Sequence, residues 1–168
     1  LSPSSAASDV YKRQVLTLAK LGKTLNKPEY VEEAKKQVLL HIQFLQDKKT
    51  GLWYHGWSFK RRDNFAGAFW GRGNSWITIA FPELLCLLDL PNGDAFREFM
   101  IMNLKYQIEA LAKYQDESGL WHTLVNDPHT YLEGSATAGF TYGILKAMHE
   151  HYIDDTLSLI HISEPTRP

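Results

Sequence analysis

The chain has 168 residues, a formal net charge of −1 and 44% hydrophobic residues, which fits one packed domain or part of a larger one. A charge this close to zero offers no electrostatic surface for nucleic acid or an anionic membrane, and no apolar run reaches the roughly 20 residues that a bilayer crossing requires. The single cysteine excludes an internal disulfide.

The two ends of the chain differ from the sequence between them. Residues 1–14 have no helical or strand periodicity and lack the apolar centre of a signal peptide. Residues 157–168 also break the helical pattern, and both strings resemble translated sequencing-adapter remnants. We therefore expect foreign, disordered segments at 1–14 and 157–168 around a natural core at 15–156, with two ordinary disordered termini as the alternative. The parent protein would then continue in both directions.

The first predicted helices lie at the start of this core. Residues 15–25 have the pattern of the last turns of a helix. A second helix is expected at 28–46, where Pro28 suits the first turn and Glu29 the positive end of the helix dipole. Its apolar residues recur at spacings of three and four, as one face of a helix requires: Val31, Ala34, Val38, Ile42 and Leu45.

Three further helices are predicted in the second half of the chain, at 76–90, 94–115 and 134–151. Asn74 and Ser75 are candidate caps for the first of these, and Pro82 should kink it or mark a late start. The last is rich in small residues, which let a helix approach its neighbours closely. No segment shows sustained alternation of apolar and polar residues, so the predicted class is all-α.

A short motif occurs twice, each time after a predicted helix. Gly51-Leu-Trp in the first loop returns as Gly119-Leu-Trp in the second, 68 residues later. This spacing exceeds the usual solenoid repeats and favours a closed ring of large helical hairpins. We expect a partial (α/α)6 barrel, a six-hairpin toroid of which about two and a half hairpins are present, with the long loops gathered at one rim.

The segment between these loops concentrates the chemistry of the chain. Trp70-Gly71-Arg72-Gly73-Asn74 places an arginine between two glycines, which let the backbone pass close to a ligand. A guanidinium makes two parallel charge-assisted bonds to a carboxylate, and a tryptophan offers a flat apolar face to a sugar ring. A structural arginine and a core tryptophan are the alternatives.

His55 is the second part of the predicted site. It lies in the first loop beside Trp57, where it can donate to a sugar hydroxyl or carboxylate or, alternatively, be a core histidine held by a carbonyl. We expect a substrate-binding set of His55, Trp57, Trp70, Arg72 and Asn74. The histidines are too scattered for a metal site, no cysteine pair is present, and no cofactor is expected.

Three other residues have simpler explanations. Trp53 and Trp121 occupy the same position in the two repeats, and we expect each to pack as a structural plug under its own loop. Glu133 precedes a predicted helix start, where the helix dipole alone favours an acid.

Four motifs, taken in order, resemble one known family. They are Gly51-Leu-Trp-Tyr-His-Gly-Trp57, Asn64-Phe-Ala-Gly-Ala-Phe-Trp-Gly-Arg-Gly-Asn-Ser-Trp76, Gln115-Asp-Glu-Ser-Gly-Leu-Trp121 and Tyr131-Leu-Glu-Gly-Ser135. Over about residues 15–150 the chain is similar to the unsaturated rhamnogalacturonyl hydrolases of glycoside hydrolase family 105, which are related to the unsaturated glucuronyl hydrolases of family 88. The resemblance implies an (α/α)6 barrel with its site at the loop rim.

The chemistry that this resemblance implies differs from ordinary glycoside cleavage. An aspartic acid protonates the double bond of a terminal 4,5-unsaturated uronic acid and activates a water that adds to it. The hemiketal that forms then collapses and releases the rest of the oligosaccharide. By matching motif positions, His55 resembles the family's site histidine and Trp70 and Arg72 its sugar-contacting pair, with Arg72 a candidate for the uronate carboxylate.

The family's catalytic aspartate belongs just upstream of the position that matches Val15, within an Asp-Thr motif. Asp9 falls near that place, but the sequence around it lacks the motif, so the catalytic residue is unknown and Asp9 is a positional candidate. We expect the parent protein to be a glycosidase of pectin degradation that acts on a small oligosaccharide, and this chain to be inactive. The expected location is cytoplasmic, with the periplasm as the alternative.

Two other classes of function remain open from the sequence. A non-catalytic carbohydrate-binding toroid would need the same tryptophan and arginine side chains, and an upstream aspartate motif would distinguish it from an enzyme. A helical scaffold that binds another protein would instead expose an apolar groove.

Overall fold

The structure of the protein is a computed structural model that describes residues 7–64 and 66–153. Five helices follow one another: α1 (Ala7–Thr24), α2 (Pro28–Leu45), α3 (Gly71–Leu88), α4 (Ala95–Lys113) and α5 (Gly134–His149). These described residues contain isolated β-bridges in the loops but no strand. The predicted all-α class is therefore confirmed.

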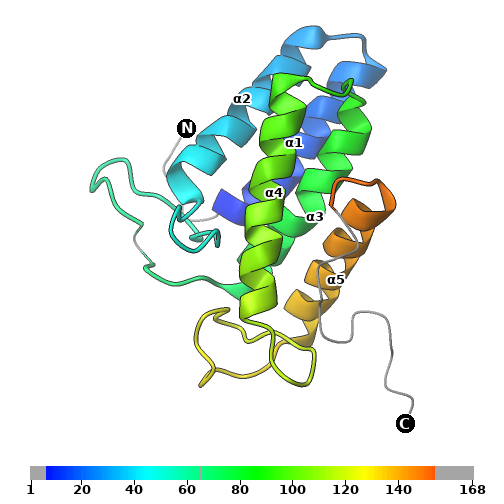
Figure 1. Ribbon diagram of the computed structural model, residues 1–168. Coiled ribbons are helices and arrows are strands. Elements are labelled where there is room, and N and C mark those ends of the chain that lie inside the picture. The colour runs from blue at the N-terminus through cyan, green and yellow to red at the C-terminus, as the bar shows by residue number, and fades with distance from the viewer. Residues whose placement is uncertain (1–6, 65, 154–168) are drawn as a thin grey trace.

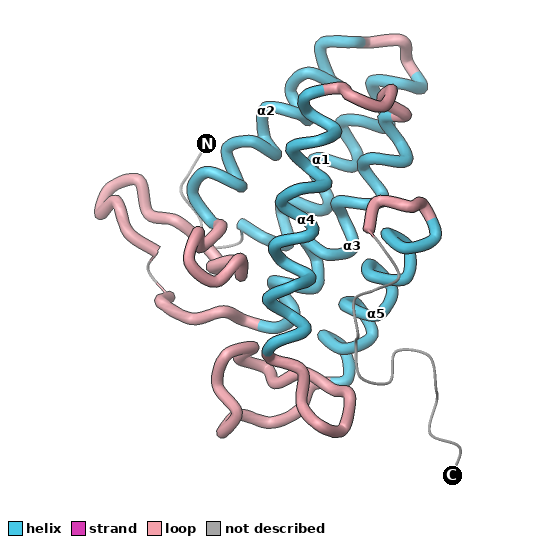
Figure 2. The backbone as a smooth tube through the Cα atoms, viewed as in Figure 1, coloured by secondary structure: helices cyan, strands magenta, loops and turns pink. Residues whose placement is uncertain are grey.

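The helices form two layers (Figure 1). α3 lies between α1 and α5 and packs against both, while α2 packs on α1 and α4 on α3. Short turns join α1 to α2 and α3 to α4, whereas the long loops after α2 and α4 lie towards the opposite end of the helices (Figure 2). This is the arrangement of successive helical hairpins, with α1, α3 and α5 in one layer and α2 and α4 in the other.

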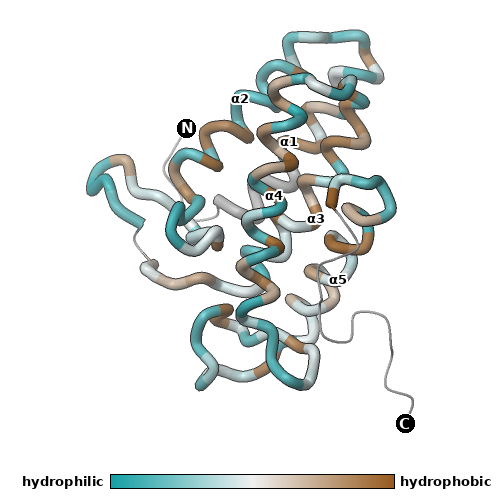
Figure 3. The backbone as a smooth tube through the Cα atoms, viewed as in Figure 1, coloured by the Kyte–Doolittle hydropathy of each residue, from teal (hydrophilic) through white to brown (hydrophobic). Residues whose placement is uncertain are grey.

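The apolar face predicted for α2 is buried, and so is an apolar stripe along α4. The members of these two stripes are Ala34, Val38, Ile42 and Leu45 of α2 and Met100, Leu104, Ile108 and Leu111 of α4. Each stripe begins with a partly buried residue, Val31 and Phe96 respectively. The short turns are mostly hydrophilic along the backbone trace (Figure 3), as expected of connections that run over the surface.

α3 begins five residues earlier than the sequence predicted. Trp70 is its N-cap and Gly71 its first residue, so the predicted caps Asn74 and Ser75 lie inside the helix and are buried. The helix also continues through Pro82, and the predicted late start is wrong. Glycine has low helix propensity, so tertiary contacts rather than propensity hold this helix start.

α1 begins at Ala7, before the predicted core boundary at residue 15. Residues 7–14 thus extend this helix and do not form the irregular segment that was expected there. Val15 and Ala19 on the same helix are buried in the core. The domain boundaries at 15–156 stay a prediction, and residues 157–168 lie outside the described part of the chain.

α5 approaches α3 closely through two of its glycines. A Cβ atom on Gly139 would lie 2.8 Å from the side chain of Ser75, and one on Gly143 would lie 2.6 Å from the carbonyl carbon of Thr78. Distances this short are excluded by van der Waals repulsion, so this spacing requires glycine. The predicted close approach of the small-residue helix is therefore confirmed.

Candidate functional site

The two Gly-Leu-Trp loops have the same backbone conformation. Gly51 and Gly119 both have a φ of 82°, a region that side chains disfavour and glycine adopts readily. In each loop the backbone N–H of an aspartate, Asp47 or Asp116, donates to the carbonyl of the leucine that follows the glycine, at 2.8 and 2.9 Å. The sequence repeat is therefore also a structural repeat.

Trp53 and Trp121 fill the same position in these loops. They are 2% and 0% exposed, and each ring packs edge-on against a phenylalanine of the helix that follows its loop, Phe81 of α3 at 5.6 Å and Phe140 of α5 at 5.3 Å. Their predicted role as structural plugs is confirmed. They differ in one respect: Trp121 Nε1 donates to the carbonyl oxygen of Leu111 at 2.8 Å, whereas Trp53 Nε1 is buried without a hydrogen-bond partner among the described residues.

Each loop is also tied to the first turns of the helix that follows it. The backbone N–H of Trp53 donates to Asn74 Oδ1 at 2.8 Å, and that of Trp121 donates to Thr137 Oγ1 at 3.1 Å. Asn74 is the fourth residue of α3, and Thr137 is the fourth residue of α5. Two different side chains therefore make the same connection in the two repeats.

Asn74 is fully buried, and its side chain bonds within the protein. Its amide group donates to the carbonyl oxygens of Trp53 and Trp70 at 2.9 and 3.0 Å, and its backbone carbonyl accepts from Gln107 Nε2 at 3.0 Å. These contacts hold the first loop against the start of α3. They favour a positioning role over the direct substrate contact that the sequence predicted.

The loop that contains Trp121 also holds the start of α3 in place. The backbone N–H of Gly71 donates to the carbonyl of Thr123 at 2.7 Å. A Cβ on Gly71 would lie 3.0 Å from the carbonyl oxygen of His122, tighter than almost all real contacts. A side chain at position 71 would therefore have to displace this loop by a few tenths of an ångström, next to Trp70 and Arg72.

Three of the predicted site residues form one row here. The rings of His55 and Trp70 lie 5.2 Å apart with their planes at 82°, and the guanidinium carbon of Arg72 lies 4.7 Å from the centre of the Trp70 ring. His55 and Trp70 are half-buried, and the side chain of Arg72 is 49% exposed. The His55–Trp70–Arg72 row thus combines an imidazole, an indole and a cation within reach of solvent.

Arg72 is paired with Glu133, the N-cap residue of α5. Arg72 Nε lies 2.9 Å from Glu133 Oε1, and the glutamate side chain is 7% exposed. From the sequence, Glu133 had only the helix dipole as its explanation. Glu133 and Arg72 are far apart along the chain. The one sequence signal that could have pointed to a role for Glu133 is its place in the motif Tyr131-Leu-Glu-Gly-Ser135.

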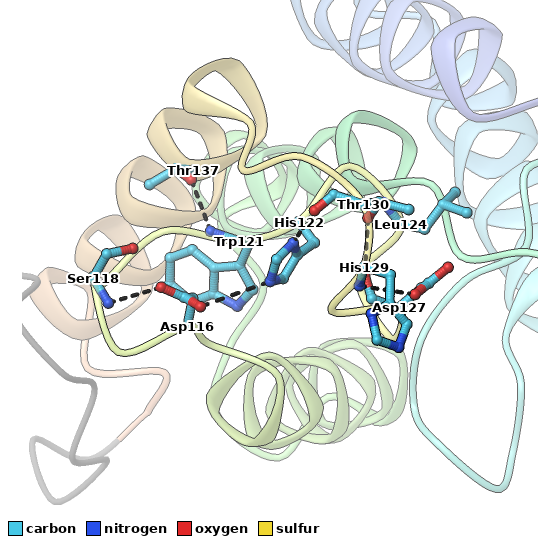
Figure 4. A network of polar contacts seen from close by, with 9 residues as sticks. All are labelled: Asp116, Ser118, Trp121, His122, Leu124, Asp127, His129, Thr130 and Thr137. Atoms are coloured by element: carbon cyan, nitrogen blue, oxygen red, sulfur yellow. Dashed lines mark hydrogen bonds and ion pairs between the residues drawn. The ribbon is translucent and has the colours of Figure 1, made fainter.

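The side chain of His122 contacts two other residues of its own loop (Figure 4). Its Nδ1 contacts the carbonyl oxygen of Thr130, and its Nε2 lies 3.7 Å from a carboxylate oxygen of Asp116. Hydrogen bonds from Ser118 hold the pKa of the Asp116 carboxyl below its usual value, and the nearby His122 adds to this effect. His122 is 9% exposed, so its contacts serve the conformation of the loop.

Two other predicted residues have different surroundings. Trp57 is half-buried and packs against Phe44 of α2, with 5.5 Å between the ring centres. It therefore belongs to an aromatic contact that covers the end of α2. Asp9 lies in the first turn of α1, where the structure does not describe side chains, and its catalytic role stays a prediction.

Across 7–64 and 66–153, no three or more histidine, cysteine or acidic side chains are grouped as metal ligands. None of the helices described is both long and apolar enough to cross a membrane. A cavity of about 330 Å³ lies between the Gln46–Gly51 loop and the second half of α4, and its lining includes no residue of the His55–Trp70–Arg72 row.

Comparison with known protein sequences identifies relatives over nearly the whole chain. Residues 14–159 match the sequence model of the family described as Glycosyl Hydrolase Family 88. Unsaturated rhamnogalacturonyl hydrolase YesR of Bacillus subtilis (strain 168) is 33% identical over 162 residues, which cover 94% of this chain and 46% of that protein. The chain thus spans less than half the length of this relative.

Solved structures give the same picture. A possible member of the GH105 family from Salmonella enterica serovar Paratyphi A matches with a TM-score of 0.89 and 59% identity, over 91% of this chain and 40% of that one. Unsaturated glucuronyl hydrolase from Bacillus sp. GL1 matches with a TM-score of 0.67 and 21% identity, over 84% and 39% of the two chains. The second likeness shows the fold alone. Together these matches confirm the predicted partial (α/α)6 barrel.

Proposed function

Because the chain belongs to glycosyl hydrolase family 88, we propose that it is part of a hydrolase that releases a 4,5-unsaturated galacturonic acid from rhamnogalacturonan oligosaccharides. The B. subtilis relative, named as an unsaturated rhamnogalacturonyl hydrolase, supports this substrate class. The chain spans 46% of that relative, so in this proposal the activity belongs to the whole protein. The predicted cytoplasmic location, with the periplasm as the alternative, stays a prediction.

The His55–Trp70–Arg72 row is the observation that carries the proposal. The half-exposed guanidinium of Arg72 suits the carboxylate of a uronic acid, because its planar fork makes parallel charge-assisted bonds. The indole of Trp70 lies beside it and offers an apolar face to the sugar ring. The ring of His55 lies 5.2 Å from the same indole, centre to centre, and supplies a polar group for a ring hydroxyl or for the reacting carbon.

The reaction that we propose is general acid–base catalysis of hydration. An aspartic acid of the whole protein gives its proton to the double bond and activates the water that adds across it. The product is a hemiketal, which opens and releases the remaining sugar. The aspartate is expected just upstream of the position of Val15, and Asp9 remains a positional candidate for it. Without that residue in its motif, the 168-residue chain is expected to show no turnover.

The test is the activity of the whole protein with Arg72→Ala. Losing one charge-assisted pair to a bound anion costs about 2–5 kcal/mol, because the partner charge is left unpaired. The value of kcat/KM should therefore fall by some tens- to thousands-fold. The assay follows the loss of absorbance of the conjugated double bond in an unsaturated galacturonyl-rhamnose disaccharide.

Arg61→Ala is the matched control, because Arg61 is also an exposed arginine paired with an acid, Asp63 at 3.2 Å, but lies outside the row. It should leave kcat/KM unchanged. Full activity of Arg72→Ala would reject the carboxylate assignment. Binding of the disaccharide by the whole protein without any turnover would instead favour a non-catalytic carbohydrate-binding toroid.

A further inference from the structure

We propose that Glu133 is a positioning residue that fixes the guanidinium of Arg72 for the substrate's carboxylate. The proposal rests on the proposed function and adds to it a residue from a different helix. Glu133 itself offers little surface to a substrate, because its side chain is 7% exposed. It acts through the orientation of Arg72.

The geometry of the pair leaves one edge of the guanidinium for a ligand. Glu133 Oε1 lies 2.9 Å from Nε of Arg72, on the side edge of the group. A guanidinium can also make two parallel bonds through its end edge, formed by the two terminal amino groups. The side chain of Arg72 is 49% exposed, so solvent reaches part of it. A carboxylate that approaches from solvent can therefore bind the end edge while Glu133 holds the side edge.

Further contacts hold Glu133 in place. Glu133 Oε1 also accepts a hydrogen bond from the hydroxyl of Ser135 at 2.7 Å, and the backbone N–H of Glu133 donates to the carbonyl of Trp121 at 2.8 Å. In addition, the centre of the Trp70 ring lies 4.7 Å from the guanidinium carbon. Arg72 is therefore held on its side edge and on one face before any ligand binds.

The second carboxylate oxygen of Glu133 makes this residue depend more strongly on Arg72. Oε2 is buried and has no hydrogen-bond partner among the described residues. A buried carboxylate with one unpartnered oxygen depends strongly on its remaining cation, because an unpaired buried charge is costly. Arg72 is the one cation that pairs with Glu133 in the described part of the chain. This dependence favours the paired orientation of Arg72 over orientations directed into solvent.

Two effects of Glu133 on substrate binding oppose each other. Its negative charge repels the substrate's carboxylate, but water screens this repulsion because Arg72 is half-exposed. Its contact with Nε removes side-chain freedom that a free arginine would lose on binding. We expect the second effect to be larger. The neutral pair then selects a carboxylate attached to a ring that also fits against Trp70, rather than any small anion.

The first experiment tests the position of Arg72 without substrate. The Nε–H of Arg72 is followed by ¹H–¹⁵N NMR in the 168-residue chain and assigned by its absence in Arg72→Ala. Its exchange with water should become about twofold to fivefold faster in Glu133→Ala, because the carboxylate that lies 2.9 Å from this nitrogen is lost. Glu98→Ala is the control, since Glu98 also lies in the first turn of a helix and pairs with an arginine, Arg97 at 2.8 Å. Unchanged exchange in Glu133→Ala would overturn the proposal.

The second experiment is a double-mutant cycle of Arg72→Ala and Glu133→Ala in the whole protein. Because the whole protein turns over the unsaturated galacturonyl-rhamnose disaccharide, the KM of this substrate is used as the measure of its binding. Glu133→Ala alone should weaken binding by about three- to tenfold, the penalty of ordering one free side chain. Added to Arg72→Ala, it should have almost no further effect, because the group that it positions is already absent.

The outcomes separate this inference from the proposed function. Tighter binding in Glu133→Ala, or an equal loss with and without Arg72, would overturn the positioning role. A merely structural role of Glu133 at the start of α5 predicts that equal loss. If the unmutated protein binds no disaccharide, the substrate assignment fails, while the exchange measurement still decides whether Glu133 holds Arg72.

Discussion

Trp53→Phe and Trp121→Phe remove the same atoms from the same position of two structural repeats, and they should differ in their effect on stability. Trp121 Nε1 donates to Leu111 at 2.8 Å, whereas Trp53 Nε1 is buried without a partner among the residues described. Both rings are almost completely buried. The loss of packing is therefore common to the two substitutions, and the hydrogen bond distinguishes them.

The expected difference follows from these contacts. Loss of the Trp121 hydrogen bond costs about 1 kcal/mol. The value is modest because the carbonyl of Leu111 also accepts from the backbone N–H of Tyr114 at 3.1 Å and keeps a partner. Removal of the Trp53 N–H relieves a buried, unpaired donor, whose burial costs about 1–3 kcal/mol. The free energy of unfolding should thus fall by about 2–4 kcal/mol more in Trp121→Phe than in Trp53→Phe.

The assay is urea unfolding of the 168-residue chain, followed by far-UV circular dichroism because the substitutions alter tryptophan fluorescence directly. Each variant is compared with the unmutated chain at equal concentration, and the slopes are checked for a change in the denatured state. Equal losses in the two variants, or a larger loss in Trp53→Phe, would refute the argument from the unpaired indole.

Three further predictions concern stability, each measured by unfolding of the same chain. Gly143→Ala should destabilise the chain by about 1–3 kcal/mol despite alanine's higher helix propensity, because the added Cβ meets a backbone carbonyl of α3. The control is Gly134→Ala on the same helix, whose Cβ meets nothing within 4 Å and which should change stability little. Unchanged stability of Gly143→Ala would contradict the close packing. Asn74→Ala should cost about 2–4 kcal/mol by breaking a buried network, and no loss would exclude its positioning role. Because the pKa of Asp116 is lowered in the fold, this carboxylate stabilises the fold above its unfolded pKa of about 3.9, and the effect is lost as pH falls through the folded pKa. In Asp116→Asn, stability should therefore fall less steeply below about pH 4 than in the unmutated chain. Superimposable acid-unfolding curves would contradict this.

Helices with a single apolar face are the part of the fold that the sequence predicts best. The predicted limits of α2 and α4, 28–46 and 94–115, lie within two residues of the observed ones. α3 is different because it lies between two neighbours, and the consecutive residues Ala80, Phe81 and Pro82 are all buried. Burial on all sides removes the periodic signal that marks where a helix starts. Its first turn depends instead on a hydrogen bond that Gly71 N–H donates to a loop carbonyl more than 50 residues later.

The candidate site also has one part that the sequence predicts and another part that it does not. The His55–Trp70–Arg72 row could be predicted because its residue types are unusual for a core and two of them lie within one short motif. The partner of Arg72 could not be predicted, because Glu133 comes from another helix and its position at a helix start already had an explanation. Asn74 shows the opposite difficulty. A polar residue in a glycine-rich motif suggests a ligand contact, but sequence alone does not show that this side chain points into the protein.

The packing of α5 against α3 has a consequence for the dimensions of the site. Arg72 starts one of these helices and Glu133 caps the other, so their separation depends on how far apart the two helix axes lie. Gly139 sets that distance, six residues along α5 from Glu133, or about 9 Å at the rise of an α-helix. A single methyl group between these two helices would act as a spacer that moves the two ends apart. The width of the proposed site is therefore determined in part by a glycine that lies about two helical turns away from it.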